Sequence, residues 1–134
     1  MNLATLRIEG EAGLLSALMK DLTFVVDSQW REGDRLRSGG THSTSGFCAT
    51  ITEASSPSKL LPKIRTFIAE YEKFLEDKDR TTISGELAVG ITIGETGQHI
   101  GSVLFGASDL LRLGQLNLAL SVSAYHASDL RARA

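Results

Sequence analysis

The segment TISGELAVGITI, residues 82–93, decides the fold of this chain. Its odd-numbered positions, Gly85 apart, carry branched apolar side chains, and its even-numbered positions are small or polar. A period of two places the apolar set on one face of a β-strand, whereas a helix would scatter it around its axis. The set is Ile83, Leu87, Val89, Ile91 and Ile93. We therefore predict a long strand in a sheet whose branched face lies under helices.

Other segments with apolar alternation predict further strands. The clearest lie at residues 3–9, 47–53 and 116–126, and less regular apolar segments follow at 23–30 and 100–105. In the first of these, Leu6 and Ile8 are expected to face the core, and Gly10 ends the strand. Residues 94–99, from Gly94 to His99, contain two glycines and predict a hairpin connection, because glycine accepts a positive φ.

Two amphipathic segments predict the main helices. Leucine and methionine recur at helical spacing in residues 11–21, and a longer apolar stripe runs from Leu60 to about Lys78. Proline is tolerated only in the first turn of a helix. Pro62 therefore lies either at the limit of a first turn capped by Ser58, or at the start of a regular helix that follows a separate turn.

A short helix is predicted at residues 109–113, with Ser108 as its cap and Gly114 after its end. The order of elements contains two strand–helix–strand units, and the long strands alternate rather than being apolar throughout. We predict an α+β fold with a mixed or antiparallel sheet of five to six strands, two main helices packed on one face, and one short helix. We expect a single domain over residues 1–126 and a frayed tail at 127–134.

The composition limits the class of protein. The chain has 134 residues, of which 42% are hydrophobic and 22% charged, as in ordinary globular domains. A net charge of −2 gives no electrostatic drive toward nucleic acid or an anionic membrane. Apolar runs are too short to cross a bilayer, and the first residues do not form a secretion signal. We expect a cytoplasmic location and no partnership with nucleic acid or membrane.

Several segments carry a resemblance to a known family. They are the Thr5–Gly10 strand with the leucine helix after it, the Trp30-x-x-Gly33 step, the amphipathic helix Leu60–Leu75 and the ending Ser108–Tyr125. Together they resemble a bacterial domain-of-unknown-function family of about this length, with a small α+β domain. The resemblance supports the fold and implies no activity and no catalytic residues. Small domains of this kind also occur in bacterial toxin–immunity neighbourhoods, which favours a protein-binding role.

The segment 31–46 is the first candidate site. It is rich in glycine and hydroxyl side chains, and a loop of about 15 residues is usually either functional or disordered. Its guanidinium groups suit phosphate or carboxylate, although acidic residues are interleaved with them. The candidates for binding an anion or a partner are Trp30, Arg31, Arg35, Arg37 and His42. For Trp30 we favour an anchor that fastens the loop to the core over a platform for a ligand.

The outer face of the later strands is the second candidate site. Its side chains are small and weakly polar, whereas a plainly solvated sheet would carry more Lys, Glu and Arg. The interface candidates are Glu86, Ala88, Gly90, Ser121, Ser123 and Tyr125. A face without bulky charges lets another protein approach closely, and a sheet edge can also recruit an extended segment.

The sequence shows no catalytic or metal-binding motif. His42, His99 and His126 lack metal-ligand spacing, and Cys48 has no adjacent base to activate it. We expect no metal and no cofactor. The leading hypothesis is a non-enzymatic protein-binding domain, either an immunity-type protein that binds a toxin or a homodimer. The alternative is a small-molecule or anion-binding domain, or a weak enzyme, that uses the Arg31–Gly46 loop.

Overall fold

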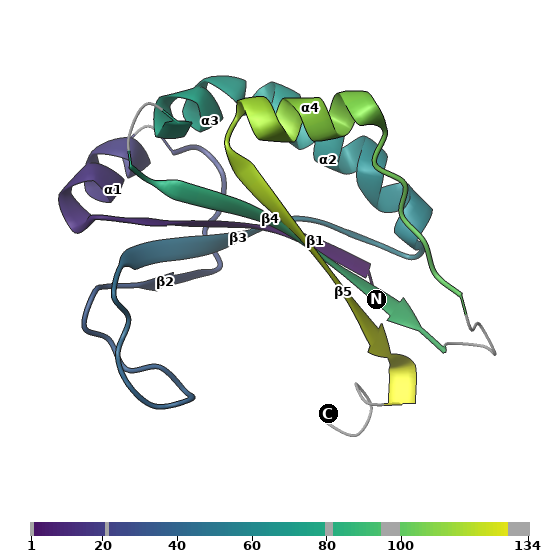
Figure 1. Cartoon of the computed structure of the whole chain (residues 1–134), viewed down its shortest axis with the longest axis horizontal. Helices are drawn as coiled ribbons and strands as arrows, with labels where there is room; N and C mark the ends of the chain where they lie inside the picture. Colours follow the sequence, from purple (N-terminus) through teal and green to yellow (C-terminus); the bar gives the residue numbers. More distant parts are fainter. Residues whose placement is uncertain (1, 21, 80–81, 95–99, 129–134) are drawn as a thin grey trace.

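The alternating segment at residues 82–93 contains β4, one of five described strands in a single sheet (Figure 1). A computed structural model describes residues 2–20, 22–79, 82–94 and 100–128. The strands are β1 (Asn2–Gly10), β2 (Ser28–Trp30), β3 (Ser45–Ala54), β4 (Ser84–Ile93) and β5 (Leu118–His126). Their order across the sheet is β2-β3-β1-β4-β5. The β4–β5 pair is parallel and the others are antiparallel, so the predicted mixed sheet is confirmed.

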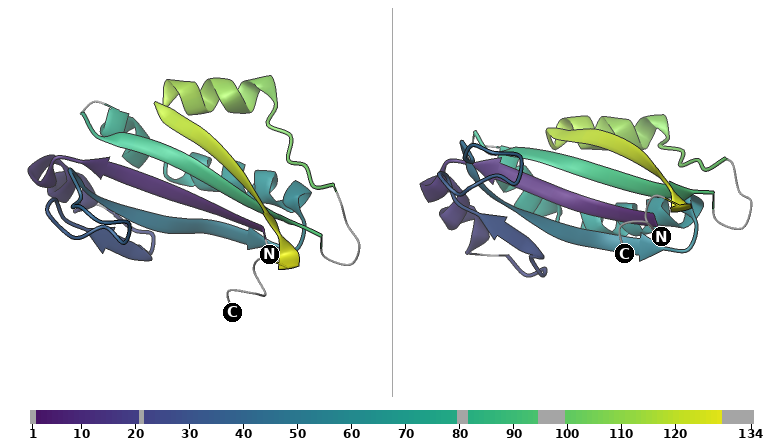
Figure 2. Two further views of the ribbon diagram at one scale, coloured as in Figure 1. Left: turned by 60° about the horizontal axis from the view of Figure 1, so that its bottom comes forward. Right: turned by 90° about the horizontal axis from the view of Figure 1, so that it is seen from below.

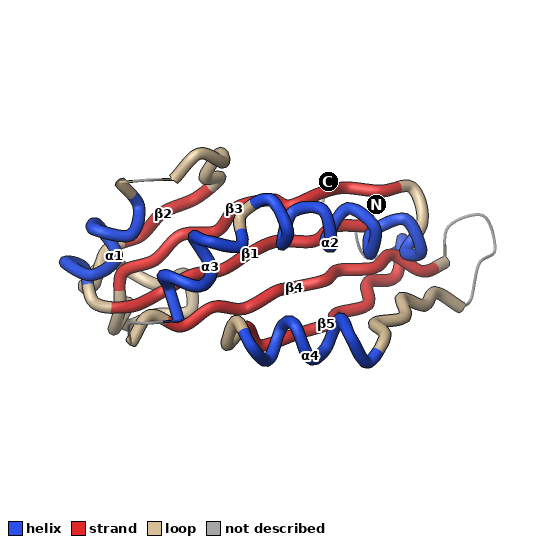
Figure 3. The backbone as a smooth tube through the Cα atoms, turned by 90° about the horizontal axis from the view of Figure 1, so that it is seen from above, coloured by secondary structure: helices blue, strands red, loops and turns tan. Residues whose placement is uncertain are grey.

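Helices lie over one face of this sheet, as Figures 1 and 3 show. They are α1 (Ala12–Met19), α2 (Leu60–Glu70), α3 (Glu72–Asp79) and α4 (Ala107–Gln115), with a 3₁₀ turn η1 (Pro57–Lys59) before α2. The described residues thus contain four α-helices, not two main helices and a short one. They contain five strands, the lower of the two numbers expected.

The core lies between the helices and the branched face of the sheet. Leu6, Ile8, Leu87 and Val89 are at most 2% exposed, which confirms the period-two pattern of β1 and β4. Leu118 of β5 is 7% exposed and joins the same cluster. Burial of this apolar surface is the main driving force for the fold, at roughly 25 cal/mol per Å² removed from water.

The strand predicted at residues 100–105 is absent from the described sheet, and the hairpin connection predicted at 94–99 lies outside the described residues beyond Gly94. Residues 101–106 belong to no described strand, and the chain passes through α4 before β5 returns parallel to β4. Val103 and Phe105 pack against the core while Leu104 is 82% exposed, so a segment outside the described strands shows the same alternation as a strand. Residues 95–99, with His99, lie outside the described part of the chain.

The single long helix expected from Leu60 to about Lys78 is divided at Tyr71, which has φ −108° and ψ 24°. Rings from both halves surround Phe24, because the centroids of Phe67 and Phe74 lie 5.3 and 5.4 Å from it. Pro62 is the third residue of α2, where the missing N–H has no helical partner to lose. The separate turn exists as η1, but the regular helix begins before the proline.

The boundaries of α4 also differ from the prediction. Gly106 precedes the helix, and its N–H donates to Asp109 Oδ2 at 2.9 Å, so Ser108 is not the cap. Gly114 lies inside the helix, and Asn117 takes the left-handed conformation after it, at φ 52°. The predicted strand at residues 23–30 shrinks to the three residues of β2, because Phe24 turns into the aromatic cluster instead of pairing.

The frayed tail predicted at residues 127–134 can be compared with the structure only at its start. Ala127 is 3% exposed, so the first residue of this segment is buried, and residues 129–134 lie outside the described part of the chain.

Candidate functional site

Among the described residues no helix packs on the other face of the sheet, and Figure 2 shows its strands in front of the helical layer. Thr92 on this face is nevertheless only 3% exposed. Directly paired residues of neighbouring strands point to the same side of a sheet. The strand register therefore aligns Thr5 with Ala88 and Ser121 in one row across β1, β4 and β5. The next row holds Leu3, Gly90 and Ser123. The predicted interface residues thus share one surface, which we call the open face.

The open face has a half with small side chains. From the row of Thr5 onward, its positions on β1, β4 and β5 hold no Lys, Arg, Asp or Glu. Tyr125, which pairs with Thr92, is 44% exposed at the end of this half. Alanine, glycine and serine lose little side-chain entropy when they are covered, so this half can be buried cheaply.

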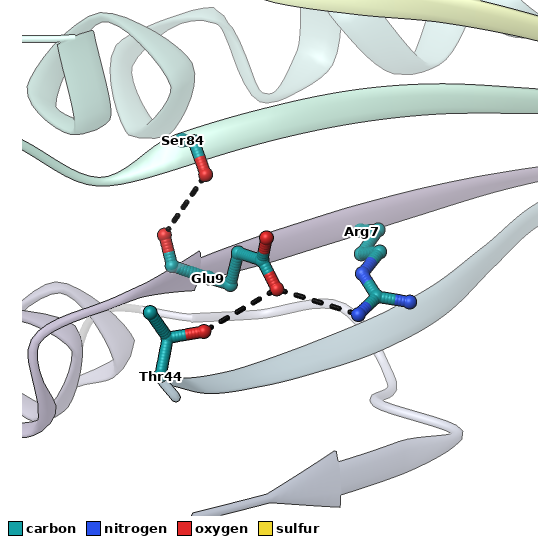
Figure 4. A network of polar contacts seen from close by, with 4 residues as sticks. All are labelled: Arg7, Glu9, Thr44 and Ser84. Carbon is teal, nitrogen blue, oxygen red and sulfur yellow. Dashed lines mark hydrogen bonds and ion pairs between the residues drawn. The ribbon is translucent and has the colours of Figure 1, made fainter. Parts of the chain in front are cut away.

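The other half of the open face is charged, and Figure 4 shows its network. Arg7 donates to Glu9 Oε2 at 3.3 Å, and Thr44 donates to the same oxygen at 3.4 Å. Ser84 Oγ donates to the carbonyl oxygen of Glu9 at 3.3 Å. Glu86, which pairs with Arg7 across β1 and β4, accepts from the Ser121 hydroxyl at 3.1 Å. Ser121 thus joins the two halves.

Trp30 fastens the loop beside this network. Its ring stacks on His42 with centroids 5.2 Å apart, and the Arg7 guanidinium lies 4.7 Å from its centroid. On the sheet it covers the backbone of Gly46, where a Cβ would lie 2.3 Å from Trp30 Cζ2. The indole Nε1 is buried with no hydrogen-bond partner among the described residues. This placement supports Trp30 as an anchor of the loop.

The loop from Arg31 to Gly46 is ordered by its own backbone. Gly33 N donates to His42 O at 2.9 Å, and His42 N donates to Asp34 O at 2.8 Å. The backbones of Arg35 and Thr41 form an isolated antiparallel β-bridge. Three positive-φ glycines, Gly33, Gly39 and Gly40, permit its turns. The loop therefore has a defined path beside the open face (Figure 1).

The loop arginines are spread outward and are not gathered around a ligand site. Arg31, Arg35 and Arg37 are exposed, and within the described residues their side chains form no ion pair. Arg31 lines a hollow of about 410 Å³ between α1 and Trp30. His42 faces the indole and not these guanidinium groups. The structure thus brings Trp30 and His42 together but leaves Arg35 and Arg37 apart from them.

Sequence reasoning missed Arg7, Glu9 and Thr44. The available signal was that Arg7 and Glu9 occupy the outward positions of a strand whose inward positions are Leu6 and Ile8. The pairing of β1 with β4, which brings Glu86 alongside Arg7, depends on the strand order and was not predictable locally.

The remaining candidates for chemistry lie on separate elements. His126 Nδ1 lies 2.6 Å from Ser128 Oγ at the end of β5, and Cys48 is half-buried on β3. In residues 2–20, 22–79, 82–94 and 100–128, no three His, Cys, Asp or Glu side chains gather as a metal ion would require.

A groove of about 240 Å³ lies on the helical side, between α2 and α4. Its walls include Ile64, Ile68 and Leu113. Arg65 and Asp109 also line the groove, and the Arg65 guanidinium donates two hydrogen bonds of 2.7 Å to the Asp109 carboxylate. The Arg65 bonds, with the Gly106 N–H, hold the pKa of the Asp109 carboxyl below its usual value. At α1, the Gly13 and Leu14 N–H groups likewise lower the pKa of Glu11, the cap of that helix.

Comparisons with protein-family models, with curated proteins and with solved structures found no match. The resemblance noted in the sequence therefore stays a prediction. Among the described residues no helix is long and apolar enough to span a bilayer.

Proposed function

We propose that this chain is a non-enzymatic domain that binds another protein on the open face. The proposal is carried by one observation: the helices leave this face bare, and half of it presents only small or uncharged side chains across three strands. A sheet face that only contacts water would be expected to carry more Lys, Glu and Arg. A partner that covers it gains close contact with the sheet backbone.

The arrangement of the face fits what protein interfaces require. A weakly polar centre with a charged rim is common in them, and aromatic side chains are enriched there. Here Ala88 and Gly90 form the weakly polar centre, Arg7 and Glu86 provide charge on one side, and Tyr125 lies on the other. The partner that fits is a protein with a convex, mainly apolar surface, since bulky side chains fill the space above small ones. A bacterial toxin is the partner that the sequence resemblance favours.

The test first identifies the partner and then maps its contact. A photo-crosslinking amino acid at position 88 is compared with the same group at Val25, which is 80% exposed outside the open face. A protein crosslinked only from position 88 is then purified, and its affinity for the wild type and for Ala88→Arg is measured by calorimetry. We expect the arginine to weaken binding at least about tenfold, or about 1.4 kcal/mol.

The matched control is Ala69→Arg, because Ala69 is exposed on α2 on the helical side. It should leave the affinity unchanged. Equal binding by Ala88→Arg and wild type would remove the open face as the docking site. The product of a neighbouring toxin-like gene is the first partner to test, and its failure to bind would count against the immunity version.

The anion-binding alternative is separated by a triple substitution of Arg31, Arg35 and Arg37 to Ala. Under our proposal the triple variant binds the protein partner as the wild type does. A thermal shift with inorganic phosphate or a carboxylate that disappears in this variant would instead support the loop as the functional site.

A further inference from the structure

The two edges of the sheet differ in a way that bears on assembly. The β2 edge has only three residues and leads into a charged loop, so it offers little backbone for pairing. The β5 edge has nine residues, LALSVSAYH, without Lys, Arg, Asp, Glu or Pro. Natural sheets usually shorten, charge or bend an exposed edge to prevent it from pairing. β5 is long and uncharged, and it contains no bulge, because its register with β4 is continuous from Leu118 to His126.

The helical side of β5 is covered over only half of its length. Leu118 is 7% exposed and Leu120 is half-buried, because α4 packs on this end of the strand. Further along the same side Val122 is 51% exposed, and Ala124 is exposed as well. Among the described residues the strand therefore presents an exposed apolar strip beside a backbone edge that pairs with no other strand.

We infer that β5 pairs antiparallel with β5 of a second copy of this chain, about a two-fold axis at Val122. Val122 is the middle residue of the strand, so centring the axis there pairs all nine residues. A two-fold axis perpendicular to the sheet makes the two edge strands antiparallel and keeps all helices on one side. The covered half of each strand then lies beside the bare half of the other, where α4 of the second copy supplies the missing cover.

A second copy fits this edge better than an unrelated strand does. In a two-fold interface a charged side chain close to the axis meets its own equivalent, and like charges repel. The absence of charged residues from β5 removes that penalty. The α4 surface adds Leu110 and Leu111, which are 49% and 63% exposed on the helix nearest this edge (Figure 3). These leucines supply apolar surface near the two-fold axis, as a self-complementary interface requires.

The experiment measures the mass of the full chain in solution by light scattering and sedimentation. The wild type should have twice the chain mass of 14.4 kDa. Val122→Lys and Val122→Glu each place like charges together at the axis, and each should weaken the dimer at least about tenfold. An equimolar mixture of the two variants brings lysine opposite glutamate and should restore the dimer. Val25→Lys, a charge at an exposed site outside the strand, should leave the dimer intact.

Each outcome decides the matter. Restoration in the mixture supports both the edge and the register, because only residues that face each other across the axis can complement in this way. A monomeric wild type, or a Val122→Lys variant that stays dimeric while its thermal unfolding shows it is folded, overturns the inference. A dimer that Ala88→Arg dissociates and Val122→Lys does not would place self-association on the open face instead. Because the edge and the open face are separate surfaces, failure of one proposal leaves the other standing.

Discussion

Arg65 of α2 and Asp109 of α4 join the two helices through a pair of hydrogen bonds, each 2.7 Å long. Both guanidinium bonds go to one carboxylate, and the second carboxylate oxygen also accepts the Gly106 N–H. The same acidic side chain thus caps α4 and fastens it to α2. Bidentate pairs of this kind fix geometry more strongly than a single contact does.

This pair predicts a specific sensitivity to acid. Because the folded state lowers the pKa of Asp109, its stabilising contribution is complete above the unfolded pKa and is lost as the pH falls through the folded pKa. Asp109→Asn should therefore unfold at lower urea concentration than the wild type at neutral pH. The two midpoints should converge as the pH falls below the ordinary pKa of an aspartate, about 4, and through the lower pKa of Asp109 in the folded state. A gap that stays constant over this range would show that the charge of Asp109 contributes nothing. Arg65→Gln is the matched variant. The difference between its urea midpoint and that of the wild type should also become smaller as the pH falls.

The aromatic cluster around Phe24 predicts a large effect of Phe67→Ala. The Phe67 ring lies 5.3 Å from Phe24 and 4.7 Å from Tyr71, and it packs against the core. Removing it should lower the free energy of unfolding by about 3 kcal/mol, as measured by urea denaturation. Val25→Ala, next to Phe24 but 80% exposed, should change it by less than about 0.5 kcal/mol. A loss below about 1 kcal/mol for Phe67→Ala would contradict the packing described here.

Two glycines predict opposite effects of the same substitution. An alanine Cβ at Gly46 would lie 2.5 Å from the Ile8 carbonyl oxygen, so Gly46→Ala should destabilise the protein by about 2–3 kcal/mol. At Gly114, inside α4, a Cβ meets no described atom within 4 Å, and Gly114→Ala should stabilise the protein by about 0.5–1 kcal/mol. Thermal unfolding followed by Trp30 fluorescence measures both. Equal effects of the two changes would argue against the close contact of Trp30 with β3.

The stack of His42 on Trp30 predicts how the loop responds to protease. His42→Ala removes an aromatic contact worth about 0.5–1.5 kcal/mol, so the loop should open more often. Trypsin cleavage after Arg31, Arg35 or Arg37 should then become roughly 2–10-fold faster, as followed by mass spectrometry. His126→Ala, at the end of β5, is the control and should leave these cleavage rates unchanged. Cleavage that is equally fast in the wild type would show that the stack does not restrain the loop.

The sequence predicted the strands whose two faces meet different surroundings. In β1 and β4 one side is buried by helices and the other is bare, so alternation is complete and the inward residues, such as Leu6 and Val89, follow from it. The crossover after β4 was not predictable, because Val103 and Phe105 show strand-like alternation although they lie outside the described strands. The break at Tyr71 was missed as well, since the contacts of Phe24 that accompany it come from a distant part of the chain.

The membership of the candidate site depends more on the strand order than on residue type. The residues of β4 and β5 were placed on one face by parity alone, and they share that face. Arg7 and Glu9 enter the site only because β1 lies between β3 and β4, which no local pattern reveals. His42 was grouped with the loop arginines by proximity in sequence, but its ring stacks on the indole.

The position of β1 has a consequence for the synthesis of the protein. This strand is made first but lies in the middle of the sheet, with β3 and β4 as its neighbours. At about 5–20 residues per second, roughly 4–15 s pass between completion of β1 at Gly10 and the first residues of β4 at Ser84. During that interval Leu6 and Ile8 have no finished core to enter. Until β4 is made, β1 can pair with β3 alone, and the edge of β1 that β4 later occupies stays open.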